Sequence, residues 1–63
     1  MRAVKVKNKS DLIQYAMGYI AGLSEMYRSG DIPDWTFRDM LHAFLLRFFS
    51  AAEELLEEGE TKI

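Results

Sequence analysis

Apolar residues recur at helical spacing through the second half of the chain. Six of them follow one another at intervals of three and four positions: Phe37, Leu41, Phe44, Phe48, Ala51 and Leu55. This spacing places the six side chains on one face of an α-helix. Gly59 offers a stop at the far end, and Pro33 stands where the first turn of a helix tolerates proline. The pattern predicts a helix over about residues 33–58, with Asp31 and Asp34 as a capping box at its start.

A second amphipathic segment precedes this helix. Ser10 followed by Asp11 is typical of a helix start, because a Ser hydroxyl caps backbone N–H groups and an acid suits the positive end of the helix dipole. Gly30 can take the left-handed conformation that ends a helix, which limits this helix to about residues 11–29. Two helices joined by so short a connection fold back on each other as an antiparallel hairpin. We therefore expect an all-α fold in a single domain, 1–63, divided into an N-terminal arm (1–9), the hairpin (10–58) and a tail (59–63).

The apolar arcs of both helices are wider than a two-helix hairpin can cover. Each helix has one neighbour in a hairpin, so large apolar side chains would stay in water, each forgoing about 1.5–3 kcal/mol. The sequence therefore predicts a homodimer with a shared four-helix core. The residues expected in that dimer core lie on the second helix: Leu41, Phe44, Leu45, Phe48, Phe49 and Ala52.

Three residues inside the predicted helices have two interpretations each. Gly18 and Gly22 lie four apart on one helix face, and each costs a helix about 1 kcal/mol relative to Ala. They indicate close approach of another helix or of the arm, unless they are simply tolerated on a solvent face. Trp35, just inside the second helix, is expected either to cover the end of the hairpin core or to anchor a partner protein.

The charges are segregated along the chain. Four of the eight basic residues stand in the arm, at Arg2, Lys5, Lys7 and Lys9, and half of the ten acidic residues stand at 53–60. The hairpin brings these two ends together, so internal pairing is one expectation, in which Lys7 and Lys9 neutralise the acidic run. The formal net charge of −2 argues against general attraction to nucleic acid or to an anionic membrane.

Candidate chemistry is scarce. The chain has no Cys and a single His, His42, with no second His or well-placed carboxylate, so we expect no metal, no cofactor and no enzymatic activity. The first nine residues lack the apolar core of a signal peptide, and the longest apolar run, 43–46, is far too short to span a bilayer. We expect a cytoplasmic protein with no membrane partner.

Residues of the arm alternate between basic and apolar. Lys5 and Lys7 alternate with Val4 and Val6, the period-two pattern of a strand. A strand followed by two helices in a short, self-associating chain is similar to the ribbon-helix-helix family of DNA-binding proteins. The resemblance implies that arms of two chains pair into a ribbon that reads the major groove, with Arg2, Lys5 and Lys7 at the DNA.

The whole chain also looks like the small helical proteins encoded in early operons of lambda-type temperate bacteriophages. The resemblance rests on the length, the basic start MRAVKVKNKSD and the aromatic-rich hairpin GYIAGLSEMYRSGDIPDWTFRDMLHAFLLRFF. It implies a protein made early in infection in the host cytoplasm, acting on host or phage regulation by binding. The leading expectation is thus a non-enzymatic homodimer that binds a host or phage protein, and the alternative is a dimeric DNA-binding regulator.

Overall fold

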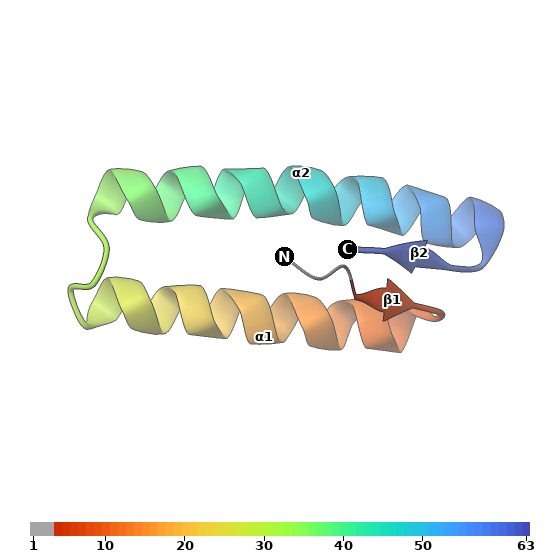
Figure 1. Cartoon of the computed structure of the whole chain (residues 1–63), viewed down its shortest axis with the longest axis horizontal. Coiled ribbons are helices and arrows are strands. Elements are labelled where there is room, and N and C mark those ends of the chain that lie inside the picture. The colour runs from red at the N-terminus through yellow and green to blue at the C-terminus, as the bar shows by residue number, and fades with distance from the viewer. Residues whose placement is uncertain (1–3) are drawn as a thin grey trace.

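Two long helices lie side by side as an antiparallel hairpin, and a small two-stranded sheet, whose strands run along the helices, lies at the open end (Figure 1). The computed structural model describes residues 4–63, so the predicted DNA contact Arg2 lies outside the described residues. The elements in chain order are β1 (Lys5–Val6), α1 (Lys9–Arg28), α2 (Asp34–Glu58) and β2 (Thr61–Lys62). The hairpin predicted from the spacing of apolar residues is confirmed.

The start of α1 differs from the prediction by two residues. Asn8, in extended conformation, is the N-cap, and its side-chain Oδ1 accepts a hydrogen bond from the backbone N–H of Asp11 at 2.9 Å. Ser10 therefore lies inside the helix, and the prediction that it starts the helix is wrong. Asn is as good an N-cap as Ser, so residue type alone does not decide between positions 8 and 10.

The turn between the helices is built around Gly30, which has a φ of 84°. Its N–H donates to the carbonyl of Tyr27 at 3.2 Å, and the N–H of Asp31 donates to the carbonyl of Met26 at 2.9 Å. These two bonds form a Schellman motif, which satisfies the last carbonyls of α1 and requires the left-handed residue that Gly supplies.

The predicted capping box at the start of α2 is wrong. Pro33 is the N-cap, and no side chain caps the helix there. The carboxylate of Asp34 instead accepts a hydrogen bond from the hydroxyl of Tyr27, across the turn. At the other end Gly59 ends α2 as predicted, with a φ of 81° and its N–H bonded to the carbonyl of Leu55.

The all-α prediction missed the sheet formed by the two ends of the chain. β1 and β2 pair antiparallel, with Lys5 opposite Lys62 and Val6 opposite Thr61. Val4 and Ile63 extend the pairing by exchanging two backbone hydrogen bonds of 2.8 and 2.9 Å. The fold is therefore mostly helical, with the arm and the tail joined to each other on one side of the hairpin.

The core runs along the inner side of the hairpin and under the sheet. Val6, Leu12, Ala51 and Leu55 form a buried cluster at the open end, against which Phe48, Ala52 and Ile63 pack. Nearer the middle, the ring of Phe44 is fully buried and lies beside the rings of Tyr15 and Tyr19. The sheet thus adds Val6 and Ile63 to a core that two helices alone would leave open at that end.

Candidate interaction surfaces

The two broad faces of the hairpin differ in what covers them. On one face the sheet packs against α2 near Arg47, Ala51 and Glu54. On the opposite face the helices bound an uncovered groove of about 270 Å³. Its lining is almost entirely apolar: Lys9, Leu12, Ile13, Phe48, Ala52, Leu55 and Leu56. The sheet therefore leaves one apolar face of the molecule uncovered.

Apolar side chains continue from this groove along both helices. Steps of three and four residues from the groove residue Ile13 reach Met17 and Ile20 on α1, and steps back from Leu56 reach Phe49 and Leu45 on α2. We call this surface the open face and define it by seven residues: Ile13, Met17, Ile20, Leu45, Phe49, Ala52 and Leu56. The exposed fractions of Met17, Phe49 and Leu56 are 65%, 59% and 71%. A soluble monomer rarely leaves so many large apolar side chains together in water.

The predicted dimer core falls on two different parts of the hairpin. Leu45, Phe49 and Ala52 belong to the open face, and Leu41 and Phe48 are half-buried between it and the core. Phe44 is 0% exposed and is covered within its own chain. Phe44 thus lies in the core that α1 and α2 form within one chain, and its place in a dimer core stays a prediction.

Gly18 and Gly22 do not mark a close approach between described elements. Both lie on the flank of α1 away from the open face, and a Cβ added at either would meet nothing within 4 Å. They border a shallow groove of about 270 Å³ that also contains Met26 and Met40. Within residues 4–63, neither α2 nor the described part of the arm packs on the two glycines, and a contact with another chain stays a prediction.

Trp35 is 65% exposed and does not cover the end of the hairpin core. The rings of Tyr27 and Phe37 close that end instead, stacked with centroids 4.6 Å apart. Trp35 lies in the first turn of α2 with its indole largely in solvent, which is the placement that the partner-anchor interpretation requires.

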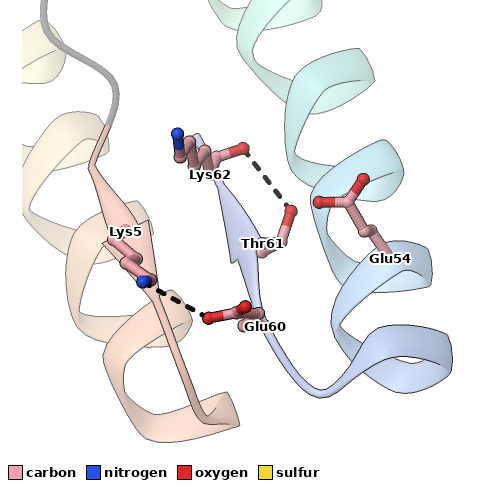
Figure 2. A pocket seen from close by; sticks show the side chains of 5 residues that line it. All are labelled: Lys5, Glu54, Glu60, Thr61 and Lys62. Atoms are coloured by element: carbon pink, nitrogen blue, oxygen red, sulfur yellow. Dashed lines mark hydrogen bonds and ion pairs between the residues drawn. The ribbon is translucent and has the colours of Figure 1, made fainter.

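The outer side of the sheet carries the charged residues of the two chain ends (Figure 2). Lys5, Glu54, Glu60, Thr61 and Lys62 line a hollow of about 360 Å³ there, with Lys5 Nζ 3.5 Å from Glu60 Oε1. Two lysines and two glutamates balance each other, so the hollow has no net preference for an anion or a cation. The two ends of the chain do form an ion pair, and it joins Lys5 to Glu60.

The pairing expected of Lys7 and Lys9 with the acidic run is not observed. Within the described residues, the ion pairs join Lys5 to Glu60 and Arg28 to Glu25. Lys7 and Lys9 are both exposed, and Lys9 lies at the edge of the open-face groove. Its ammonium is thus placed at the rim of an apolar surface.

The pKa of Tyr27, in the last turn of α1, is shifted. The hydrogen bond that the Tyr27 hydroxyl donates to Asp34, together with the negative charge of that carboxylate, raises the pKa of Tyr27 above its usual range. Ionising Tyr27 would break the bond and place two negative charges side by side.

His42 is on the surface, as expected for a histidine without ligand partners. Across residues 4–63 no group of three or more His, Cys, Asp or Glu is placed to hold a metal ion. Over the same residues, neither helix is long and apolar enough to cross a membrane.

Comparisons with protein-family models, with curated proteins and with solved structures gave no match for this chain. The chain's own surfaces therefore carry the functional argument.

Proposed function

We propose that this protein is a non-enzymatic regulatory protein that acts by protein–protein binding as a homodimer. The observation that carries the proposal is the open face, which gathers seven apolar positions from both helices on the side that the sheet leaves uncovered. The same face of a second copy can bury it, because under a two-fold axis each apolar residue of one copy is matched by the identical residue of the other.

The homodimer is tested by sedimentation equilibrium at micromolar concentration. The wild-type chain should sediment as a dimer, and Phe49→Gln should shift it toward monomer while its far-ultraviolet circular dichroism stays helical. Ala43→Gln is the matched control, since Ala43 is also exposed on α2 but lies on the side away from the open face. A wild-type protein that remains monomeric at 7.3 kDa contradicts the proposal.

A different surface is available for the regulated partner. Trp35 lies near the turn and outside the open face, so it stays accessible when two open faces meet. A binding anchor of this kind is typically a large aromatic side chain, and its truncation typically costs 2 kcal/mol or more of affinity. The test compares capture of a partner from bacterial lysate by the wild type, Lys5→Gln and Trp35→Ala. Capture by the first two and loss with Trp35→Ala, at unchanged dimerisation, supports this assignment. Equal capture by all three contradicts it.

DNA binding through the arm is the second candidate, and one feature of the sheet favours it. Lys5 and Lys62 are cross-strand neighbours, and because Val6 and Thr61 point inward, these two lysines face outward from the ribbon. Paired basic residues on a ribbon suit phosphate contacts. The ribbon of this chain pairs β1 with its own β2, whereas the resemblance implies pairing between chains.

A salt titration of duplex binding separates the two candidates. If the ribbon binds DNA, changing Lys5, Lys7 and Lys62 to Gln should lower affinity and reduce the slope of log K against log salt by about one unit per lost phosphate contact. If the protein acts through protein binding alone, the triple variant and the wild type should show the same weak retention of DNA.

A further inference from the structure

The apolar positions of the open face follow two heptad-like stripes. On α1 the spacing from Ile13 through Met17 to Ile20 is four and three, and on α2 the four residues from Leu45 to Leu56 are spaced four, three and four. This spacing is the one that lets helices pack along their length in a bundle. Each helix already uses a separate inner stripe for its partner in the hairpin, so the outer stripes are left for a second pair of helices.

The open face is not uniform along the hairpin. Its apolar residues occupy the open end and the middle, where Ile13 and Leu56 border one groove. Toward the turn the same stripes continue with polar residues, Ser24 and Tyr27 on α1 and Arg38 and His42 on α2. The aromatic contacts of Tyr19 with Phe44 and of Tyr27 with Phe37 fix which residues of the two helices lie at the same level.

This lengthwise asymmetry distinguishes the two ways in which identical faces can meet. If the copies ran in opposite directions with full overlap, the apolar end of each would cover Arg38 and His42 of the partner subunit, which would lose hydration without a hydrogen-bonding partner. If the copies ran in the same direction, apolar halves would cover each other and polar halves would cover each other. Only the second arrangement uses the whole face.

Charge at the rim favours the same arrangement. With the open ends together, a two-fold axis along the hairpin places each α1 over α2 of the other copy. Lys9, which lines the groove, then lies over the acidic C-terminal turns of α2 in the other copy, where Glu53 of the partner subunit, four residues from Phe49 and three from Leu56, borders the open face. The Cα atoms of the molecule span 39 × 18 × 16 Å and the side chains extend beyond them, so a face along its two longer dimensions is of the order of the roughly 800 Å² per partner of a standard interface.

We propose that two copies pack open face on open face with their turns at the same end, α1 of each copy lying over α2 of the other. The result is a four-helix bundle in which neighbouring helices are antiparallel. This inference rests on the proposed homodimer and specifies its geometry.

The distance between the two turns in the dimer tests the arrangement directly. The chain has no Cys, so Asp31→Cys, in the exposed turn, gives one spin-label site per copy. With helix layers about 8–10 Å apart, turns at the same end should give a distance within roughly 25 Å once the label arms are included. Turns at opposite ends should give a distance near the 39 Å length of the hairpin or longer.

Sedimentation of the labelled protein separates the failure of this geometry from the failure of the homodimer. A dimer with the long distance overturns the same-direction arrangement and leaves the homodimer standing. A monomeric chain overturns both. A dimer with the short distance supports both.

A charge exchange provides a second, independent readout. Lys9→Glu should weaken dimerisation roughly tenfold at low salt, since two symmetric contacts change from attraction to repulsion. Adding Glu53→Lys should restore most of the affinity. Glu54→Lys is the matched control, because it makes the same charge change one residue along, on the side of α2 that faces the sheet. Equal restoration by both changes, or none by Glu53→Lys, overturns the arrangement.

Discussion

The rings of Tyr19 and Phe44 stack face to face in the middle of the hairpin, with centroids 4.2 Å apart and planes 10° apart. The guanidinium carbon of Arg47 lies 5.8 Å from the centroid of the Tyr19 ring and 5.7 Å from that of Phe44, on the side of the molecule that the sheet partly covers. Stacked aromatic pairs contribute about 0.5–1.5 kcal/mol beyond the area that they bury. This pair is the central contact between α1 and α2.

Phe44→Ala should therefore destabilise the protein more than any change at an exposed apolar residue. Loss of a fully buried Phe costs about 3–5 kcal/mol, a large share of the stability of so small a domain. Leu46→Ala is the comparison, since Leu46 lies two residues away but is mostly exposed, and it should cost about 0.5 kcal/mol. Urea unfolding of both variants at one protein concentration measures the difference; comparable losses would contradict the placement of Phe44.

Replacing the four glycines by Ala should lower the stability at two positions and raise it at the other two. Gly30 and Gly59 have φ values of 84° and 81°, which Ala adopts only with strain, so Ala at either should cost about 1 kcal/mol. Gly18 and Gly22 are inside α1 with open space around them, so Ala at either should stabilise by about 0.5–1 kcal/mol. Thermal unfolding can measure these changes in stability, because 1 kcal/mol shifts the unfolding midpoint by roughly 4–8 °C in a domain of this size.

The Gly22→Ala variant also tests the other interpretation of Gly18 and Gly22, close approach of another helix or of the arm. If another helix or the arm packed closely on Gly22, the added methyl group would destabilise the protein. A lower midpoint for Gly22→Ala, alongside a raised one for Gly18→Ala, would show such a contact.

Alkaline pH should weaken the contact between Tyr27 and Asp34. The raised pKa of Tyr27 in the folded state means that the hydrogen bond contributes fully below the unfolded tyrosine pKa, about 10, and is lost as pH rises through the folded value. Asp34→Asn removes the carboxylate charge and should move one tyrosine titration to lower pH. Absorbance of tyrosinate near 295 nm, compared between wild type and Asp34→Asn, measures this shift; superimposable curves would exclude the contact.

The ion pair between Lys5 and Glu60 should have a small, salt-dependent effect on stability. Lys5→Gln should lower the free energy of unfolding by about 0–1 kcal/mol at low salt, since both side chains of the pair are more than half exposed. Lys7→Gln makes the same charge change without removing an ion pair and should cost less. The difference should vanish near 1 M salt, where the screening length falls to about 3 Å. A difference that survives high salt would mean that Lys5 acts by packing instead.

The helices could be predicted from sequence because their signals are local and repeated. The apolar stripe from Phe37 to Leu55 continues over five helical turns, and Gly30 and Gly59 mark the two stops by a backbone geometry that few other residues adopt. The start of α1 was placed two residues late, because Asn8 and Ser10 are both good N-caps and residue type alone does not decide between them.

The sheet could not be predicted in the same way. β2 is two residues long, and its inward residue is Thr61, a polar side chain that carries no apolar alternation. Its pairing with β1 depends on a contact between the two ends of the chain, which arises only after the hairpin has formed. The alternation of Val4 and Val6 with lysines did indicate a strand, but the sequence held no information on which strand would pair with it.

The position of Trp35 shows a related limit. Its proximity to Ile32 and Phe37 in sequence favoured a buried indole, yet α2 begins only at Asp34, and the first turn directs residue 35 away from α1. The side chain that fills the end of the hairpin is Phe37, two positions further and therefore on the other side of the helix.

The pairing of Val4 with Ile63 makes the described chain almost a closed ring. Only a few hydrogen bonds and the side chains of Val6, Thr61 and Ile63 hold this contact together. Such a contact forms last and opens first. The backbone amides of residues 4 and 63 should therefore exchange with solvent long before those at the centre of α2, so that the ribbon opens and closes many times within the lifetime of the folded hairpin.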